Sequence, residues 1–528
     1  MIPRIFTVNG QPFFPLGGQA RNSSGYNDTE SEAAFRAVKL IHGNTLEIPI
    51  YWEQIEPVEG QFNFASLEAL LASARRYDLR LVLLWFGTWK NGNMDYAPDW
   101  VKTAPERFWR VKSASGKEVW VLSSHCPATL EADARAFEAL CHHLKSADPQ
   151  QTVIALQIEN EPGILGSDRD YGSIAQSVFD SPVPAELIEN MKNAAQSREY
   201  EIWQQAGSNK SGSWPEIFGR EAGEMMTAWS IAVFINHLAA RGKAILDLPM
   251  YINVWLRENG WMVPGESYPS GGAVSKTLEL YKWFTPQVDL IAPDIYIADD
   301  KGYAAQCALY NRPDNPLFVP ESAPGSSNSW NMFRALGEYN AIGYAFFAVE
   351  HVLAPDGSLR DDHQMLADSF RCAAAAIPLL LRYQGTGKIH PVVQDENLGA
   401  QPLALDGWLG MADFGQGHKD WRHFQKGAPP YPARGRGLVF QASRNEFYVV
   451  GADFRLLLRP QLLPEQMLDI SVARENLLAC LAHYVSVEEG HFDAHGQFVA
   501  DRQRNGDEID FGVWVTPEAG VVRVRMTD

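Results

Sequence analysis

The sequence predicts an α/β protein, a (β/α)8 TIM barrel followed by a smaller β-sandwich-like domain. Eight short apolar runs alternate with helical stretches between residue 11 and about residue 381. This alternation is typical of a closed parallel sheet covered by helices. From about Tyr383 onward, glycines interrupt the chain and short strand-like runs replace the helices, which favours a β-rich module. A chain of 528 residues has room for both domains.

We place the barrel at residues 1–383 and the β-rich accessory domain at residues 384–528. A long insertion of about residues 164–217 follows the fourth strand, and residues 184–205 in it have a helical pattern. The eight predicted barrel strands are residues 11–22, 44–53, 79–87, 152–161, 249–255, 288–296, 316–322 and 341–350. Helices are predicted at residues 30–41, 65–76 and 130–145, and strands of the second domain at residues 437–442, 446–451, 498–500, 509–515 and 520–525.

The composition limits the classes of partner. The formal net charge is −19, and apolar residues make up 46% of the chain without a run of about 18 that would span a membrane. Nucleic acids and anionic membranes are bound by clustered Lys and Arg, so neither partner is expected. We expect a soluble protein with a neutral ligand, and self-association as a homo-oligomer stays open.

The cysteines and the first residues carry little functional information. The five cysteines are odd in number and never spaced as CxxC, so neither a disulfide framework nor a zinc site is expected. We expect buried thiols. Residues 1–6 lack the charged and apolar regions of a signal peptide. The sequence as given is therefore expected to be cytoplasmic, or periplasmic or secreted if a signal was removed.

Two stretches of the same design predict a pair of carboxylates. Residues 152–163 form an apolar run that ends in Glu161 before the breaker pair Pro162 and Gly163. Residues 316–322 repeat the design and place Glu321 at the end of the seventh strand. A lone Glu is more simply a solvated acid in a turn. Because the carboxyl ends of barrel strands converge at one mouth, two such acids predict a functional pair.

Three tryptophans fall at the ends of predicted strands: Trp52, Trp85 and Trp89. Any one of them is more simply a core residue. Three at one rim predict surfaces on which sugar rings stack, since the faces of a pyranose present C–H groups to an aromatic ring.

Other polar and aromatic residues near strand ends are candidates for substrate binding. Asn253 and Trp255 end the fifth strand, and Glu47 lies in the second. For Glu53 and Glu350 a structural role and a contact with a sugar hydroxyl both stay open, and Glu350 is kept among the candidates. Two further acids, Glu159 and Asp294, also lie near strand ends.

No motif for a metal or a cofactor is present in the sequence. The histidines form no HExxH spacing, and neither a phosphate-binding GxxxxGK[ST] loop nor a GxSxG nucleophile elbow occurs. We therefore expect no metal and no cofactor.

The strand-end residues resemble the clan A retaining glycoside hydrolases, which are built on (β/α)8 barrels. The resemblance rests on Asn160 and Glu161 after the fourth strand, Tyr296 after the sixth and Glu321 after the seventh. Within the clan, residues 157–163 are similar to the signature of family 35 β-galactosidases, which usually have a Tyr where this chain has Pro162. Residues 47–53 and 84–89 are also similar to bacterial family 35 members that carry an extra C-terminal β domain.

The resemblance implies a role for each of these residues. Glu161 would be the acid/base, Glu321 the nucleophile, Asn160 a partner of the sugar 2-hydroxyl, and Tyr296 a hydrogen-bond partner of Glu321. Tyr296 would keep Glu321 ionised, and repulsion from that anion would raise the pKa of Glu161. Retention of configuration requires the two carboxyl groups to be about 5–5.5 Å apart.

We therefore expect a retaining, exo-acting β-galactosidase that hydrolyses terminal β-galactosides of oligo- or polysaccharides by double displacement. One alternative is another clan A β-glycosidase, such as a β-glucosidase, a β-xylosidase or an endo-glycanase. A second alternative, of a different class, is a barrel that only binds carbohydrate. The presence of both Glu161 and Glu321 disfavours the second alternative.

Overall fold

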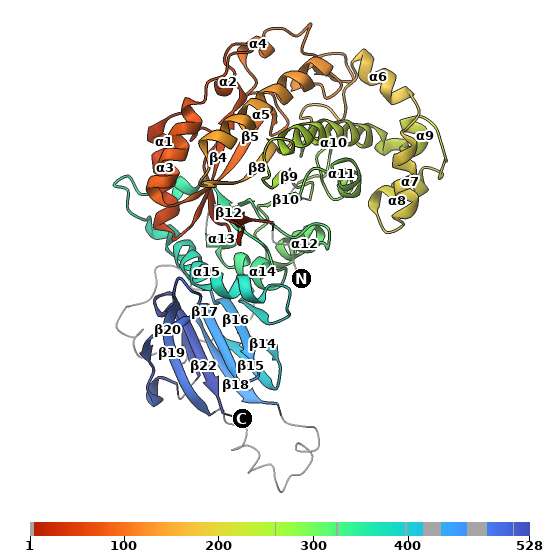
Figure 1. Cartoon of the computed structure of the whole chain (residues 1–528). Helices are drawn as coiled ribbons and strands as arrows, with labels where there is room; N and C mark the ends of the chain where they lie inside the picture. The colour runs from red at the N-terminus through yellow and green to blue at the C-terminus, as the bar shows by residue number, and fades with distance from the viewer. Residues whose placement is uncertain are drawn as a thin grey trace.

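The computed structural model describes residues 5–258, 260–323, 326–395, 399–414, 434–461, 483–509 and 512–527. These residues form a TIM barrel that is followed by a two-sheet β-sandwich (Figure 1). The predicted fold class is confirmed.

Eight parallel strands form the barrel, and all eight lie where the sequence predicts them. The sheet closes between its last two strands, because Val319 bridges Tyr344 and the amide of Ala345 donates to the carbonyl of Val319 at 2.8 Å. The third strand runs further than predicted, to Lys90. The strands in chain order are β3 (Leu16–Gln19), β4 (Thr45–Tyr51), β5 (Arg80–Lys90), β8 (Val153–Asn160), β9 (Met250–Trp255), β10 (Leu290–Ile295), β11 (Glu321–Ser322) and β12 (Tyr344–Phe347).

Helices follow the strands and cover the barrel. The predicted helices at residues 30–41, 65–76 and 130–145 are confirmed as α1, α3 and α5. Local sequence explains their ends: the Asn27 side chain accepts from the amide of Glu30 at the start of α1, and Pro127 occupies the first turn of α5. The covering helices are α1 (Asp28–Leu40), α3 (Ala65–Tyr77), α5 (Pro127–Ala147), α10 (Ala222–Lys243), α11 (Leu278–Phe284), α12 (Asp300–Tyr310), α14 (Asn331–Gly337) and α15 (Gln364–Tyr383).

Shorter elements lie in the connections. They are β1 (Thr7–Val8), β2 (Gln11–Pro12), α2 (Trp52–Ile55), α4 (Asp99–Lys102), β6 (Arg110–Lys112), β7 (Glu118–Leu122) and α13 (Ser326–Ser329).

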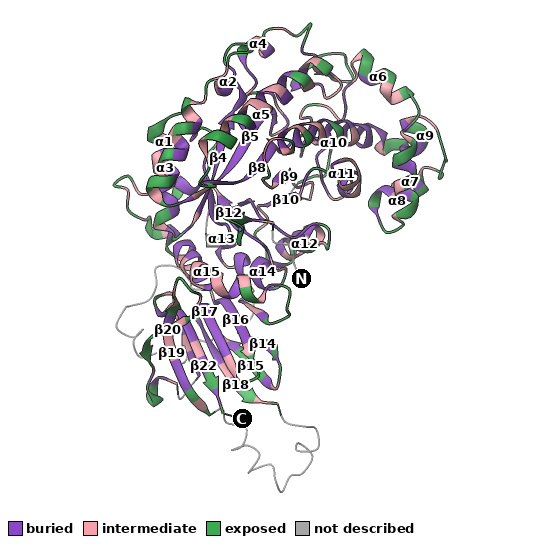
Figure 2. Cartoon of the chain, viewed as in Figure 1, coloured by how far each residue is buried: buried purple, intermediate pink, exposed green. Residues whose placement is uncertain are grey.

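The side chains of β5 show how the barrel is filled. Val82, Leu84 and Phe86 belong to the cluster inside the barrel, whereas Leu81, Leu83 and Trp85 belong to the cluster between strands and helices. This separation follows from the two-residue period of a strand. Figure 2 shows the barrel strands buried and the outer faces of the helices exposed. The barrel is therefore a packed core with its polar residues gathered at the strand ends.

The insertion after β8 carries four helices, drawn in yellow in Figure 1. They are α6 (Ser173–Asp180), α7 (Ala185–Asn193), α8 (Arg198–Gln205) and α9 (Trp214–Phe218). The prediction of a single helix over residues 184–205 is wrong, because α7 ends at Asn193 and α8 starts anew. The hydroxyl of Ser197 accepts from the amide of Tyr200 at 3.0 Å and so caps α8.

The C-terminal part packs two antiparallel sheets face to face. The six-stranded sheet has the order β13-β16-β17-β22-β19-β20 and the four-stranded sheet the order β14-β15-β18-β21. Their shared core includes Trp408, Phe447 and Phe454. The strands are β13 (Ile389–Val393), β14 (Ala400–Leu405), β15 (Trp408–Asp413), β16 (Arg436–Ser443), β17 (Glu446–Ala452), β18 (Phe454–Pro460), β19 (Tyr484–Phe492), β20 (Phe498–Gln503), β21 (Val513–Val515) and β22 (Val521–Met526).

Strand predictions for this domain are partly confirmed. Strands β16, β17, β20 and β22 match predicted runs, and β21 covers the end of the predicted strand 509–515, of which residues 510 and 511 lie outside the described residues. Strands β13, β14, β15, β18 and β19 were not predicted from the sequence. Cys480 also lies outside the described residues, and the other four cysteines are buried free thiols, as expected.

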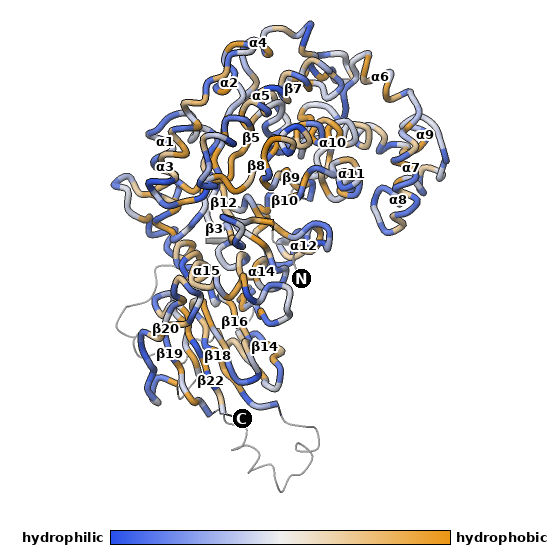
Figure 3. The backbone as a smooth tube through the Cα atoms, viewed as in Figure 1, coloured by the Kyte–Doolittle hydropathy of each residue, from blue (hydrophilic) through white to orange (hydrophobic). Residues whose placement is uncertain are grey.

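Helix α15 connects the barrel to the sandwich. Among the described residues, the segment Asp361–Tyr383 is the one helix long and apolar enough to cross a membrane by composition, and half of its most apolar stretch is buried within the protein. It packs against β3 on one side and against β16 and β17 on the other. Figure 3 shows hydrophobic residues on α14, α15 and β16 where these elements meet. Packing in the core therefore accounts for its apolar character.

Gly17 in β3 allows this strand to lie close to β4. A Cβ atom added at Gly17 would lie 1.7 Å from the carbonyl oxygen of Thr45 in β4, far inside van der Waals contact. We predict that Gly17→Ala lowers the free energy of unfolding by about 3 kcal/mol or more, because two paired backbones would have to separate. Chemical unfolding measures this change. Gly506→Ala is the matched control, since nothing lies within 4 Å of its added Cβ, and an equal loss in both variants would contradict the argument.

Candidate active site

Three carboxyl groups meet at the carboxyl end of the barrel. Glu161 follows β8, Asp294 lies in β10 and Glu321 begins β11. One carboxylate oxygen of each lies within 4.8 Å of the other two. Glu161, Asp294 and Glu321 are 7%, 3% and 5% exposed, respectively. The two acids predicted from the sequence are thus brought together, and a third acid joins them.

Glu321 is surrounded by hydrogen-bond donors from three strands or their ends. Tyr296 donates its hydroxyl to Oε2 at 2.7 Å. The Gln19 amide donates to Oε1 at 2.6 Å, and the Asn253 amide approaches the same oxygen at 3.3 Å. Three neutral donors stabilise a negative charge on this carboxylate without adding a countercharge. The contact between Tyr296 and Glu321 is the one that the sequence resemblance implied.

Glu161 occupies a different environment. Burial raises the pKa of Glu161 to about 7, and repulsion from Glu321 adds to the rise, while Lys90 and a hydrogen bond with Asp294 oppose it. The Asn91 amide donates to Oε2 at 2.7 Å, and the backbone amide of Glu161 donates to Asn253 Oδ1 at 2.8 Å. The carboxyl group is therefore held in place and stays largely protonated below neutral pH.

The backbone around the end of β8 is strained. Glu159 and Glu161 both have left-handed backbone angles, with φ of 60° and 46°. Such angles cost a non-glycine residue conformational free energy. These conformations persist at sites where the surrounding structure fixes them. Between them, Asn160 is fully buried, and neither atom of its amide has a hydrogen-bond partner among the described residues. A buried amide with free donor and acceptor atoms is suited to a polar ligand.

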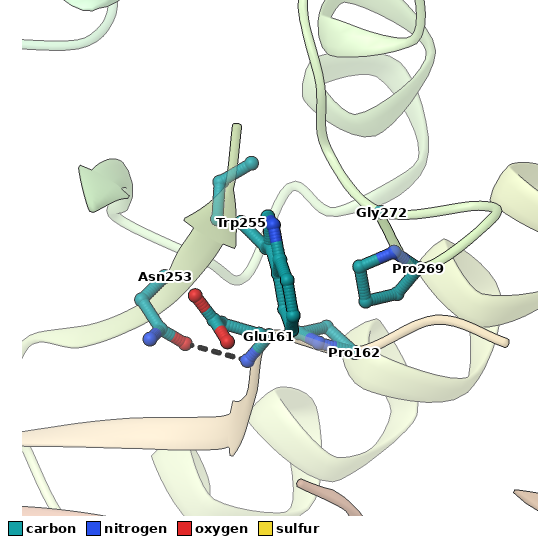
Figure 4. A pocket seen from close by; sticks show the side chains of 7 residues that line it. Glu161, Pro162, Asn253, Trp255, Pro269 and Gly272 are labelled. Atoms are coloured by element: carbon teal, nitrogen blue, oxygen red, sulfur yellow. Dashed lines mark hydrogen bonds between the residues drawn. The ribbon is translucent and has the colours of Figure 1, made fainter. Parts of the chain in front are cut away.

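A small hollow lined by Glu161, Pro162 and Trp255 opens at the barrel mouth (Figure 4). In Figure 4 the Trp255 ring stands beside the Glu161 carboxylate, and Pro269 lies on the other side of that ring. Asn253 and Gly272 also line the hollow. Asn253 and Trp255, two candidates from the sequence, therefore lie at the site.

A second pair of buried acids supports the end of β5. Glu159 and Asp133 of α5 are fully buried and hydrogen-bond to one another. Burial raises the pKa of both groups, so one proton is held between them. Glu159 also accepts from the amide of Trp89 at 2.7 Å, and Asp133 accepts from Thr88. The pair thereby fixes the backbone that leads directly to Lys90 and Asn91.

The expected stacking role of three tryptophans is wrong. Trp52, Trp85 and Trp89 are at most 1% exposed and belong to the core between strands and helices. Trp85 points outward because it alternates with Phe86, and its indole donates to Asp133 at 2.8 Å. Trp89 lies inside β5 rather than beyond it. A sugar ring has no access to these faces.

The remaining acids near strand ends have protein partners. Glu47 is buried and accepts from the Tyr251 hydroxyl at 3.0 Å, and burial raises its pKa well above the usual range. Glu350 accepts from the amide of Arg21 at 3.2 Å and from the Ser24 hydroxyl, so its carboxylate holds the loop after β3. That set of contacts favours the structural role for Glu350. Glu53 likewise binds Lys102 and Tyr26.

Four residues of the site were not singled out as site residues from the sequence: Gln19, Lys90, Asn91 and Asp294. Each lies at the carboxyl end of a barrel strand or directly after it. Their position at strand ends was the signal in the sequence that could have identified them as site residues. Only Asp294 was noted there, and only as one of several acids.

Comparison with known families gives two matches. Residues 24–220 match the family model described as Beta-galactosidase, glycoside hydrolase family 42. Residues 366–516, which span α15 and most of the sandwich, match a model described as a domain of unknown function, DUF5597. A comparison with curated proteins finds no significant sequence match.

Solved structures share the fold at low sequence identity. The β-galactosidase from Bacillus circulans sp. alkalophilus is 15% identical with a TM-score of 0.50, over 71% of this chain and 58% of its own. A catalytic mutant of a GH42 β-galactosidase from G. stearothermophilus is 13% identical with a TM-score of 0.50, over 72% and 59%. The catalytic domain of β-amylase from Paenibacillus polymyxa is 12% identical with a TM-score of 0.50, over 67% and 97%.

These comparisons correct one expectation. The match over residues 24–220 is to family 42, so the resemblance to family 35 is not supported, whereas the broader clan A layout fits. The chain spans less than two thirds of the length of the β-galactosidase structures that it resembles. Because a β-amylase shares the fold to the same degree, the fold alone does not select a substrate.

The buried pair of Glu159 and Asp133 leads to a stability prediction. We expect Glu159→Ala to lower the free energy of unfolding by about 2–4 kcal/mol, because the amide of Trp89 and the Asp133 carboxylate lose a buried partner. Glu159→Gln should lose less than about 1 kcal/mol, because an amide keeps a donor toward Asp133.

The pH dependence of unfolding provides the control. Since the folded protein holds a proton that the unfolded chain releases above pH of about 4.3, the stability that this pair contributes falls as pH rises above that value. This loss should be smaller in Glu159→Gln. Equal unfolding free energies for the Ala and Gln variants at every pH would contradict the shared proton.

Proposed function

We propose that this protein is a retaining, exo-acting β-galactosidase that hydrolyses terminal β-galactosides by double displacement. The observation that carries the proposal is the closeness of Glu161 and Glu321, whose nearest oxygens are within 4.8 Å at the barrel mouth. Retaining enzymes hold their two carboxyl groups at about 5–5.5 Å, and inverting enzymes at about 6.5–9.5 Å to admit water. The family match over residues 24–220 supports galactose as the sugar.

In the first step Glu321 attacks the anomeric carbon while Glu161 gives its proton to the departing oxygen. The two roles require one ionised and one protonated carboxyl group at the same pH. The donors around Glu321 and the raised pKa of Glu161 supply this difference. In the second step Glu161 removes a proton from water, which attacks the glycosyl ester and releases the sugar with its original configuration.

Asn160 and Trp255 would contact the sugar. The free amide of Asn160 next to Glu161 suits a hydrogen bond to the 2-hydroxyl, a contact that strengthens as charge develops on the ring. The ring of Trp255 lies beside the Glu161 carboxylate and offers an apolar face to the C–H side of a pyranose (Figure 4). The two carboxyl groups supply the chemistry, so the mechanism requires neither a metal nor a cofactor.

Exo action agrees with the shape of the site. The segment after Glu161 pairs with the loop after β9, since the amides and carbonyls of Ile164 and Ser270 bond reciprocally at 2.9 Å. Glycines at 163 and 272 allow this close approach, and an added Cβ at Gly163 would lie 2.5 Å from Pro269. This wall beside the hollow favours one terminal sugar over a chain that passes through.

A panel of aryl glycosides tests the substrate. We expect nitrophenyl β-galactoside to be hydrolysed with a kcat/KM at least about tenfold above those of the glucoside and xyloside. A preference for another β-glycoside would support the alternative clan A specificity. Uniform inactivity would overturn the enzymatic proposal and favour a carbohydrate-binding barrel.

Substitution of the two acids tests their roles. Glu161→Ala should still form the glycosyl-enzyme from a dinitrophenyl galactoside, because this leaving group departs without a proton, and should then stall. Azide should restore turnover and give a β-configured product. Glu321→Ala should show no burst of released phenol, and azide should give the α-configured product by direct attack. Swapped configurations, or identical losses in the two variants, would contradict the assignment.

The pKa of Glu161 predicts the pH dependence of activity. The acid must be protonated to assist a poor leaving group, so kcat/KM for a methyl or unactivated phenyl galactoside should fall as pH rises through about 7. With a dinitrophenyl galactoside, whose departure needs no proton, the fall near this pH should disappear. An identical basic limb for both substrates would show that another group controls it.

A further inference from the structure

The third carboxyl group of the site, Asp294, has no role in the double displacement described above. It lies within 4.8 Å of both Glu161 and Glu321, and its residue is 3% exposed. Its backbone is paired with that of Glu321 on β11 and with that of Trp255 on β9, so its position is fixed by the sheet. An acid at such a place is not a solvated turn residue.

Glu321 and Asp294 differ in the number of hydrogen-bond donors that can stabilise a negative charge on them. Glu321 has donors from Tyr296, Gln19 and Asn253. Within the part of the chain that the structure describes, Asp294 has one such donor, the Asn253 amide, which donates to Oδ2 at 2.8 Å. Its other oxygen, Oδ1, accepts from no N–H or O–H group of the described residues. Of these two carboxyl groups, Asp294 is therefore the poorer place for a negative charge.

The charged and titratable groups that face Asp294 favour the same conclusion. Two carboxyl groups and three phenol groups stand around it, against one cation. Burial, followed by repulsion from Glu321 and Glu161, raises the pKa of Asp294 well above its usual range, with Lys90 as the opposing charge. The groups that face it are Glu161 after β8, Glu321 of β11, Lys90 of β5, Tyr251 of β9, Tyr296 after β10 and Tyr310 of α12.

We propose that Asp294 is a positioning residue that carries a proton at the working pH and donates it in a hydrogen bond to the Glu161 carboxyl group. This inference rests on the proposed function. A protonated Asp294 stabilises Glu161 once Glu161 has given up its own proton to the leaving group. It therefore limits how far burial and Glu321 raise the pKa of the acid/base, and it orients the carboxyl group without contacting the sugar.

The consequence for the reaction is a division of two protons among three acids. Before the first step, Glu161 and Asp294 each hold a proton and Glu321 holds the charge. After the first step, Glu321 is an ester and Glu161 is the anion, which Asp294 then stabilises. The cluster thus carries one negative charge in both states, and a buried site avoids a second uncompensated charge.

Two substitutions at Asp294 test this division by the pH profile of kcat/KM with an unactivated galactoside. In Asp294→Asn, the amide oxygen can accept from Asn253 and the amide N–H can donate to Glu161, so the basic limb should stay within about 0.3 pH units and activity within about threefold. Asp294→Ala removes the donor, so the basic limb should move up by about one pH unit. Asp289→Asn, at the opposite end of β10, is the matched control and should not move it.

Each alternative gives a different result. If Asp294 were ionised, Asp294→Asn would remove a negative charge and move the limb down by about one unit, which would overturn the inference. A loss of activity in Asp294→Ala without a shift of the limb would assign it a packing role only and would also overturn it.

Infrared difference spectroscopy at neutral pH separates this inference from the proposed function, because it requires no turnover. Subtraction of Asp294→Asn from wild type should show the C=O stretch of one protonated buried carboxyl group. If a carboxylate band is lost instead, the inference fails, whatever the enzyme hydrolyses. If the protonated band is lost but no glycoside of the panel is cleaved, the proposed function fails while the protonated Asp294 stands.

Discussion

The burial of several carboxyl groups at one rim of the barrel is the constraint on which the site depends. Charges of one sign in an apolar medium repel strongly, so protons and neutral donors must be distributed among them. The donors come from different strands: Gln19 from β3, Asn91 after β5 and Asn253 from β9. The second acid pair, Glu159 and Asp133, fixes the end of β5 beneath them by sharing one more proton. The barrel therefore sets the protonation of Glu161 through its geometry.

The sequence predicted the barrel and its two principal acids for a clear physical reason. Strands covered on both faces are continuous apolar runs, and such runs end abruptly where a polar residue reaches the rim. Glu161 and Glu321 stood at two such ends, and the structure places them together. The contact between Tyr296 and Glu321 also followed, although from resemblance rather than from spacing. In the C-terminal domain, the predicted strands include β16 and β17, which contain runs of β-branched and aromatic residues.

The rest depends on features that become visible only in three dimensions. The face to which a strand residue points is set by register, so Trp85 is in the helix-facing core although it lies near a rim. Gln19, Asn91 and Asp294 are ordinary polar residues far apart in the chain, and only closure of the sheet makes them neighbours. Strands such as β14 and β15, which flank Gly407, lack a continuous apolar run, because alternate positions face solvent. They were therefore not recognised among the surrounding glycines. The identity of the family match likewise could not be obtained from the seven-residue signature around Glu161.

The central claim is that Glu321 becomes covalently bound to the sugar while Glu161 serves as the acid/base. Incubation with 2,4-dinitrophenyl 2-deoxy-2-fluoro-β-galactoside tests it most directly, because the fluorine slows both steps and the activated leaving group lets the intermediate accumulate. Peptide mass spectrometry should then find one fluorogalactosyl group on the peptide that contains Glu321, and none on Glu161. A label on Glu161 or Asp294, or released phenol without any label on a protein that hydrolyses the parent galactoside, would contradict the account.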